Sequence, residues 1–266
     1  MIRKEYEELC FTDDFMFCKV LSNNSELCQE LLELVLGIKI SRIELVEGQK
    51  SIEHTYDGRG IRLDVYVEDE ENIVYDIEMQ TVVRKNLPKR SRYYQGMIDL
   101  NLIKRGADFG ELKMSYIIFI CSNDPFGYGL PVYTFTNRCS QNPDIKLEDG
   151  SVKVIVNVAG SRDGISDEMA SFLDYLQGKA VKSDFTRRLQ DDVKHAIAHE
   201  EWRLEYMTLD MIRREEREEG REEGRMSMLY SLASDGIISI SDAAKRAGMS
   251  EDDFVIAMND GLSESR

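Results

Sequence analysis

The sequence predicts an α/β fold with a helical C-terminal extension, and three patterns support this prediction. Residues 62–67 and 73–80 alternate apolar and polar side chains around a short acidic turn, as an antiparallel hairpin does. Residues 114–121 are almost all β-branched or aromatic, which is typical of a strand buried on both faces. Apolar residues at helical spacing lie before and after these segments.

The N-terminal elements follow from capping and turn residues. Thr12 or Asp13 is expected to cap the first helical segment, which breaks at residues 23–25 and ends near Gly37. A strand is expected at residues 43–46. A polar turn at residues 54–60 then leads into the hairpin.

After the hairpin, Pro88 opens a helix of roughly four to five turns that ends near Gly106. One stripe of this helix is expected to carry Tyr93, Met97 and Leu100. Two later strands are expected at residues 132–136 and 153–158, with a hairpin turn at residues 148–150. Ser166 or Asp167 is expected to cap the next helix, which runs through Leu176. From about residue 184 onward the pattern is helical throughout.

Composition indicates a soluble globular protein, because 42% of the residues are hydrophobic and 32% are charged. No apolar run approaches the roughly 18 residues that a membrane span requires, so no membrane partner is expected. Residues 1–10 lack the apolar segment of a signal peptide, and the expected location is cytoplasmic. The five cysteines form no CxxC pair and are expected to be reduced thiols, mainly buried.

Charge is distributed unevenly along the chain. The net charge of −16 argues against a nucleic-acid partner, since phosphate contacts need lysine and arginine. Residues 84–105 nevertheless hold seven basic residues and one acid, and could neutralise a phosphate backbone. The basic residues are Arg84, Lys85, Lys89, Arg90, Arg92, Lys104 and Arg105. A solvated helix start would explain the same segment.

The predicted hairpin gathers acids on one face. Alternation places Leu63, Val65 and Val67 on the apolar face, which needs no contribution from Tyr66 for packing. The other face carries Asp64, Tyr66, Asp76, Glu78 and Gln80. With a loop at residues 70–72, Asp64 lies directly opposite Glu78, and a two-residue shift of register preserves the faces.

Two carboxylates on neighbouring strands are typical ligands of Mg²⁺, which also keeps waters and binds substrate phosphate. A bound ion polarises a phosphoryl oxygen and activates a water for attack on phosphorus. A solvated polar face of the hairpin remains the alternative interpretation of the same residues.

Four segments carry a family resemblance: residues 13–21, 60–65, 75–80 and 89–95. Together they resemble the recombination-promoting nuclease and transposase-like family of the PD-(D/E)XK nuclease superfamily. The GREEGR stretch is similar to the repetitive tails of these proteins, so the resemblance spans roughly residues 10–225. It implies a restriction-endonuclease-like core, a mixed central sheet flanked by helices, and Mg²⁺-dependent cleavage of DNA, in which Mn²⁺ can substitute.

The resemblance also assigns residues. Asp64, Glu78 and Gln80 would be catalytic, with Asp64 and Glu78 as the metal ligands. Gln80 occupies the superfamily's lysine position; it can orient a water or bind a phosphate oxygen but carries no charge. Lys85, Arg84 or Arg92 could supply that charge, and Asp14 is a candidate auxiliary acid, although its place at a helix start explains it equally well. The implied DNA-binding residues are Arg84, Lys85, Lys89, Arg90 and Arg92.

The expected organisation is a nuclease domain at residues 1–200, a charged helical linker at 201–228 and a small helical module at 229–266. In this module Ala244, Gly248 and Ser250 have the spacing of a helix-turn-helix. The helix that would read DNA begins with three acids, at residues 251–253, which favours packing or self-association instead.

The leading hypothesis is a DNA endonuclease of low sequence specificity, linked to DNA recombination or to mobile elements. The alternatives are a catalytically inactive nuclease-fold protein that acts as an interaction module, and a transposase. DNA is the expected partner, and a homo-oligomer or protein partner could bind through the C-terminal helices.

Overall fold

The structure is a computed structural model that describes residues 4–53, 59–82 and 85–264. The chain divides into two compact units, Met1–Glu200 and Glu201–Arg266. The first unit contains a sheet and its covering helices, and the described part of the second is helical. Within the described ranges, no helix combines the length and the apolar composition needed to cross a bilayer.

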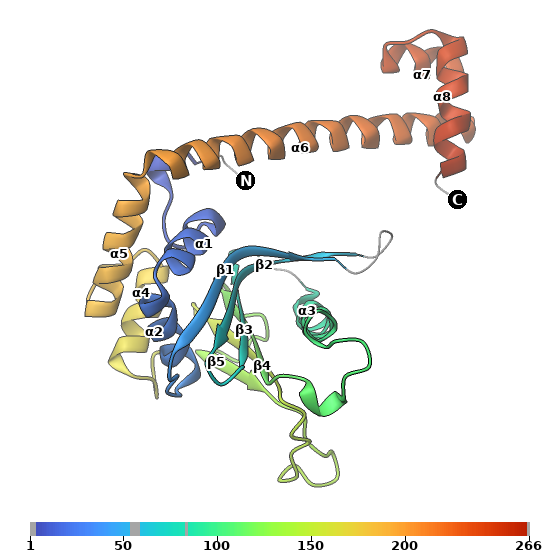
Figure 1. Cartoon of the computed structure of the whole chain (residues 1–266). Coiled ribbons are helices and arrows are strands. Elements are labelled where there is room, and N and C mark those ends of the chain that lie inside the picture. Colours follow the sequence, from blue (N-terminus) through green and yellow to red (C-terminus); the bar gives the residue numbers. More distant parts are fainter. Residues whose placement is uncertain (1–3, 54–58, 83–84, 265–266) are drawn as a thin grey trace. The chain divides into compact units, whose positions relative to one another are not determined.

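A six-stranded sheet lies at the centre of the first unit (Figure 1). Its strands are β1 (Ile43–Ile52), β2 (Ile61–Asp69), β3 (Val74–Gln80), β4 (Ser115–Cys121), β5 (Val132–Phe135) and β6 (Ser151–Asn157). Their order is β1-β2-β3-β4-β6-β5. The pairs β1–β2, β2–β3 and β5–β6 are antiparallel, whereas β3–β4 and β4–β6 are parallel, so the sheet is mixed and the predicted fold class is confirmed.

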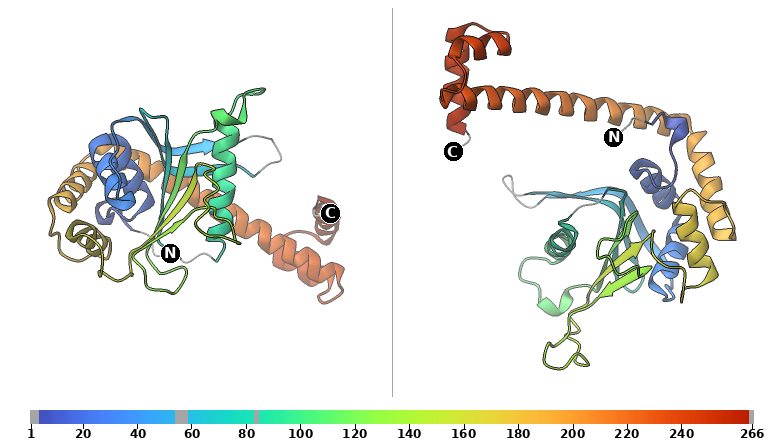
Figure 2. Two further views of the ribbon diagram at one scale, coloured as in Figure 1. Left: turned by 90° about the horizontal axis from the view of Figure 1, so that it is seen from below. Right: turned by 180° about the vertical axis from the view of Figure 1, so that it is seen from behind.

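Helices cover the two faces of this sheet unequally. One face carries α1 (Asp14–Asn23), α2 (Ser25–Leu36), α4 (Asp167–Leu176) and α5 (Asp184–Ile197). The other face carries α3 (Leu87–Leu102). Figure 2 shows the sheet between these two layers from below and from behind. Single 3-10 turns occur at Tyr6–Glu8 and Phe109–Glu111.

Each face of the sheet packs a separate hydrophobic core, which corrects one prediction from the sequence. Val65 and Val67 of β2 face the four-helix layer as expected. Tyr66 points the other way and is 0% exposed in the core under α3, so its face of the hairpin is packed and not a solvated face. Leu63, which alternation places with Val65 and Val67, joins this second core instead.

Helix α3 meets the sheet through only part of the predicted stripe. Met97 is buried in the second core as that stripe implies, together with Leu87 and Ile98, whereas Tyr93 and Leu100 are 41% and 57% exposed. Gln95 is buried as well: its Nε2 donates to Ser115 Oγ of β4 at 2.5 Å, and its Oε1 accepts from Ser151 Oγ of β6 at 3.2 Å. These bonds anchor α3 over two strands and satisfy the amide of Gln95 on a buried face that is otherwise mainly apolar.

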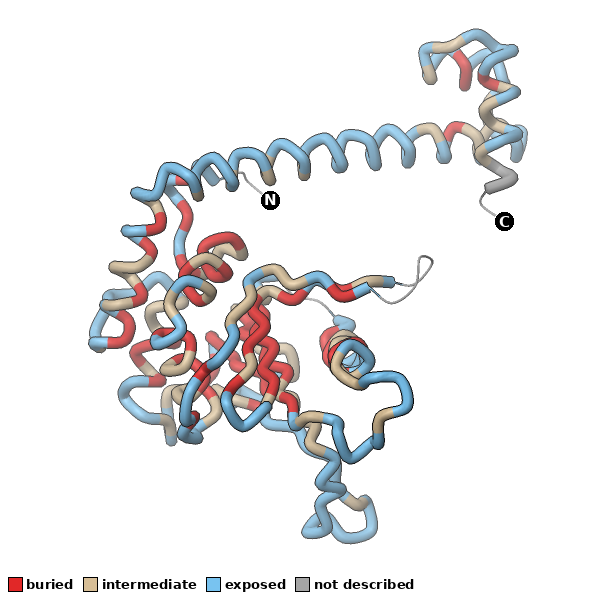
Figure 3. The backbone as a smooth tube through the Cα atoms, viewed as in Figure 1, coloured by how far each residue is buried: buried red, intermediate tan, exposed pale blue. Residues whose placement is uncertain are grey.

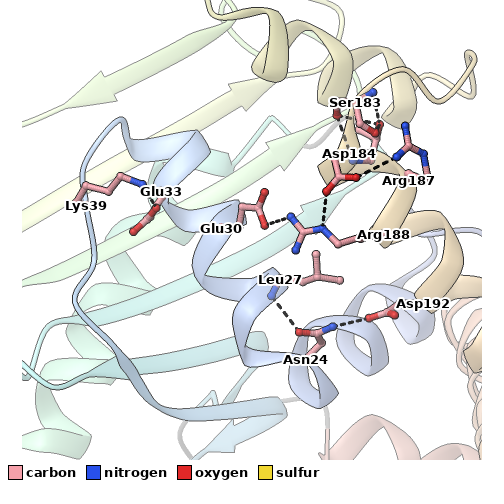
Figure 4. Close-up of polar contacts among 11 residues, drawn as sticks. Asn24, Leu27, Glu30, Glu33, Lys39, Ser183, Asp184, Arg187, Arg188 and Asp192 are labelled. Carbon is pink, nitrogen blue, oxygen red and sulfur yellow. Dashed lines mark hydrogen bonds and ion pairs between the residues drawn. The ribbon is translucent and has the colours of Figure 1, made fainter.

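The predicted break between α1 and α2 is confirmed, and Asn24 stabilises it (Figure 4). Its Oδ1 accepts a hydrogen bond from Leu27 N at 3.1 Å and caps α2, while its Nδ2 donates to Asp192 Oδ2 of α5 at 2.8 Å. An ion pair between Glu30 and Arg188 joins the same two helices. Asn24 therefore caps one helix and fastens it to another.

Replacement of Asn24 by alanine is expected to lower the free energy of unfolding by about 1–2 kcal/mol, because a cap and a side-chain partner are lost together. Urea denaturation followed by circular dichroism measures this change. The neighbouring Asn23→Ala is the matched control, since the exposed Asn23 side chain bonds locally to Lys19 O. Equal losses in the two variants would contradict the dual role of Asn24.

The second unit consists of α6 (Glu200–Ser234), α7 (Ile240–Ala247) and α8 (Glu251–Glu264). Figure 3 shows that α6 is exposed along most of its length, and the charged repeat at residues 213–225 is helical as expected. A small core joins Leu229 of α6 to Ala243, Ala244 and Phe254. The turn between α7 and α8 follows the prediction: Gly248 has φ 73°, and Ser250 Oγ accepts from Asp253 N at 3.1 Å.

Candidate active site

The β2–β3 hairpin sets the geometry of the acidic residues, and its register agrees with the prediction. Val65 lies opposite Ile77 and Tyr66 opposite Asp76. Beyond Val65 and Ile77, where the paired ladder ends, bonds between backbone N–H groups and side-chain carboxylates join Asp64 to Glu78 and Met79. The turn is closed by Asp69, whose Oδ1 accepts from the backbone of Glu71 at 3.0 Å and of Ile73 at 2.9 Å. Local turn chemistry and alternation therefore suffice to bring the two acids together.

Asp64 and Glu78 are held crosswise by the backbone. Asp64 N donates to Glu78 Oε1 at 2.9 Å, and Met79 N donates to Asp64 Oδ2 at 3.0 Å. Each carboxylate is thus bound to the opposite strand, with a second oxygen left to face the site. On Glu78 this second oxygen, Oε2, lies 3.2 Å from Arg90 Nη2.

Burial makes the ionised forms of both acids unfavourable. Removal from solvent, followed by the neighbouring charge of Asp64, raises the pKa of Glu78 to about 8, against the opposing effects of the bond from Asp64 N and the charge of Arg90. Burial likewise raises the pKa of Asp64 to about 6; the bond from Met79 opposes this rise, and the charge of Asp14 adds to it. The site therefore concentrates negative charge where little solvent can stabilise it.

Asp76 is a member of this cluster that the sequence did not single out. Alternation places it on the same face as Glu78, but it is 0% exposed, and among the described residues neither carboxylate oxygen has a hydrogen-bond partner. Burial, followed by the charges of Glu78 and Asp64, raises its pKa well above the ordinary value. The missing signal was the cover provided by α3, which period-two alternation does not reveal.

Asp14 approaches the site from the first residue of α1. Its Oδ2 forms an ion pair with Arg62 Nη2 at 3.9 Å, and its negative charge contributes to the raised pKa of Asp64. Within the described residues, no group of three or more histidine, cysteine, aspartate or glutamate side chains lies close enough to hold one ion. Asp14 is therefore an electrostatic neighbour of the pair in this structure.

Gln80 and Arg90 complete the inner part of the site. Arg90 Nη1 donates to Gln80 Oε1 at 2.5 Å, and Gln80 Nε2 donates to Val82 O at 2.6 Å. Arg90 thus turns inward from the first turn of α3, unlike the exposed Lys85, Lys89 and Arg92. Arg84 lies outside the described residues. A pocket of about 260 Å³ adjoins Gln80 and is lined in part by Lys85, Pro88 and Phe126.

The pair of acids fits a hard divalent cation. Carboxylate oxygens are the ligands that Mg²⁺ prefers, and the crowded, buried charge of Asp64 and Glu78 is the kind that a cation stabilises. Two protein ligands are sufficient, because Mg²⁺ is commonly bound by one or two carboxylates together with waters and substrate phosphate.

Comparison with known families identifies the segment that builds this site. Residues 11–129 match the family model described as PD-(D/E)XK nuclease family transposase. The matched segment belongs to this family. Comparison with the curated proteins and with the solved structures gives no match.

The resemblance predicted from the sequence is confirmed within these bounds. The PD-(D/E)XK segment runs from before α1 to beyond β4, and it contains Asp14, Asp64, Glu78, Gln80 and Arg90. The family description supports a nuclease-like or transposase-like function. The roles of the individual residues and the identity of the metal are taken up as proposals.

Proposed function

We propose that this chain is a metal-dependent DNA endonuclease that hydrolyses phosphodiester bonds with low sequence specificity. The observation that carries the proposal is the crosswise pair of Asp64 and Glu78, two buried carboxylates with raised pKa values on adjacent strands. Perturbed acids that cluster in this way are typical of catalytic sites. A link to DNA recombination or to mobile elements is part of the proposal and is supported by the family description.

Asp64 and Glu78 would hold Mg²⁺, and Mn²⁺ can substitute because it also accepts oxygen ligands. When bound, the ion polarises a phosphoryl oxygen and lowers the pKa of a coordinated water. The contribution of the chain is positional: the backbone bonds from Asp64 N and Met79 N fix both carboxylates before substrate arrives. The rigid hairpin thereby avoids the cost of ordering two flexible side chains.

The DNA backbone would lie along the start of α3. Lys85, Lys89 and Arg92 are exposed there, close in sequence to the site residue Arg90, and Arg84 extends the basic run. The first turn of a helix also presents backbone N–H groups and a positive dipole end to phosphate. Local positive charge can therefore attract DNA despite the net charge of −16.

Replacement of Lys89 and Arg92 together by glutamine is expected to weaken DNA binding to a similar extent for all sequences. Two lost phosphate contacts should reduce the slope of log affinity against log salt by about 2. Fluorescence anisotropy with labelled DNA in EDTA, over a series of salt concentrations, measures the slope. The control is Arg187→Gln with Lys194→Gln, which removes the same charge from α5. Identical slopes in both double variants would argue against this interface.

Cleavage of supercoiled plasmid tests the proposed activity. Purified full-length protein is incubated with plasmid in Mg²⁺, Mn²⁺ or EDTA, and nicked and linear products are quantified. We expect nicking with either metal and none with EDTA. The proposal fails if neither supercoiled plasmid nor single-stranded DNA is cleaved in any metal.

A further inference from the structure

The proposed site contains an arginine whose position the nuclease proposal does not yet use. Gln80 is neutral, so it brings no positive charge to the two acids. Lys85 and Arg92, two candidates from the sequence, are exposed on α3 or just before it. Arg90 instead reaches both Glu78 and Gln80.

The guanidinium of Arg90 is held from several directions. Nη2 donates to Glu78 Oε2 at 3.2 Å and to Tyr94 Oη at 3.1 Å, and Nη1 donates to Gln80 Oε1 at 2.5 Å. Its Cζ lies 5.3 Å from the ring centroid of Tyr94 and 5.1 Å from that of Phe119. A planar cation with stacked rings and several acceptors has little freedom to move, so its charge is preorganised.

Arg90 is nevertheless open to a ligand. Its side chain remains 19% exposed, and the bonds above occupy three of its five N–H groups. Among the described residues, the other two have no hydrogen-bond partner. These two donors, on Nε and Nη1, diverge, so each can donate singly to a phosphate oxygen beside the permanent positive charge.

Both ends of the Gln80 amide are engaged. Its Oε1 accepts from Arg90 and its Nε2 donates to Val82 O, so the amide joins the end of β3 to the guanidinium. This arrangement fixes which way Gln80 points. It gives Gln80 a role in placing Arg90, in contrast to the direct contact with water or phosphate expected from the sequence.

We propose that Arg90 is the positively charged catalytic residue of this site, contacting the scissile phosphate, and that Gln80 is the positioning residue that aims it. The arginine stabilises the negative charge that develops on the phosphoryl oxygens during cleavage. Arg90 also donates to the carboxylate of Glu78, so a proposed metal ligand helps to fix the position of the guanidinium. This inference rests on the proposed nuclease function and specifies how the charge is supplied.

Variants of Arg90 and Gln80 separate this role from a structural one. Single-turnover plasmid nicking is measured for Arg90→Gln, Arg90→Lys, Gln80→Lys and the surface control Arg187→Gln. We expect Arg90→Gln to cleave about 10²-fold or more slowly, Arg90→Lys to retain an intermediate rate, and the control to match wild type. Gln80→Lys should also be slower, because its ammonium would displace the Arg90 guanidinium.

Calorimetric titration with Mn²⁺ in the absence of DNA supplies a second readout. Loss of the Arg90 charge beside Glu78 should leave Mn²⁺ affinity unchanged or increase it, whereas collapse of the site would weaken it. Weaker Mn²⁺ binding by Arg90→Gln, or faster cleavage by Gln80→Lys, would overturn the inference. An active wild type with an equally active Arg90→Gln removes this inference alone, whereas an inactive wild type removes it together with the proposed function.

Discussion

Glu78→Gln is expected to reduce metal-dependent DNA cleavage by about 10²–10⁴-fold while leaving the fold intact. Glutamine keeps an oxygen that can accept from Asp64 N but removes the charge that would bind the cation. Asp64→Asn should behave in the same way, since its amide oxygen can still accept from Met79 N. Single-turnover nicking with Mg²⁺ and with Mn²⁺ measures both effects.

Thermal melting tests whether unfolding is the cause of the lost cleavage. Burial raises the pKa of Glu78 to about 8 from an ordinary 4.5, so the folded protein binds a proton more tightly than the unfolded chain. The contribution of this group to stability is therefore greatest at low pH and declines as the pH rises from about 4.5 to about 8. In EDTA at pH 8, Glu78→Gln should melt at or above the wild-type temperature.

The control for activity is Glu71→Gln in the exposed loop of the same hairpin. It makes the same chemical change on the same element, and it should cleave at the wild-type rate. If Glu78→Gln cleaved as fast as Glu71→Gln, the proposed role of Glu78 would be wrong.

The second large effect is expected in the C-terminal unit, where Phe254→Ala should lower the free energy of unfolding of this unit by about 3–5 kcal/mol. Phe254 is 0% exposed, and its ring lies 5.2 Å from that of Tyr230 in a core whose other buried residues are Leu229, Ala243 and Ala244. Because the core has few other buried side chains, its neighbours cannot fill the volume that the ring leaves. The α7–α8 pair should therefore unfold locally. Hydrogen exchange, resolved by segment, measures this loss in the full-length chain.

The same variant tests what the second unit does. The acids at residues 251–253 disfavour DNA reading by α8, and Ile237 and Ile256 are 66% and 62% exposed, which suits protein contacts better. If the unit serves association, Phe254→Ala should lower the mass found by light scattering and leave the cleavage rate per active site unchanged. The matched surface variant Ile256→Val should keep the unit folded. Protection of residues 229–264 that equals wild type in Phe254→Ala would contradict the predicted core.

Local patterns in the sequence were sufficient for the hairpin and for its acids. Alternation along β2 and β3 assigns the faces, and a loop at residues 70–72 sets the register. Both features are encoded within a few residues of Asp64 and Glu78. The break before Ser25 and the helix start after Ser166 were equally local, because each depends on one capping side chain.

Features that depend on distant packing were not predicted. The sequence does not show that α3 covers the acidic face, so the burial of Tyr66 and Asp76 was missed. The inward position of Arg90 was missed for the same reason, although a signal was present: Arg90 and Tyr94 lie four residues apart, beside the stripe that includes Leu87 and Ile98. The run of basic residues concealed this difference, because charge alone does not distinguish an inward arginine from an outward one.

Direct titration of the metal tests the central claim, that Asp64 and Glu78 together hold a divalent cation. Isothermal titration calorimetry with Mn²⁺ and with Mg²⁺ is performed on wild type, Asp64→Asn, Glu78→Gln and the loop control Glu71→Gln. We predict saturable binding to wild type and to the control, and affinity lower by at least about 10- to 100-fold in each site variant. Equal affinity in all four proteins would show that the cation does not bind at this pair and would contradict the account.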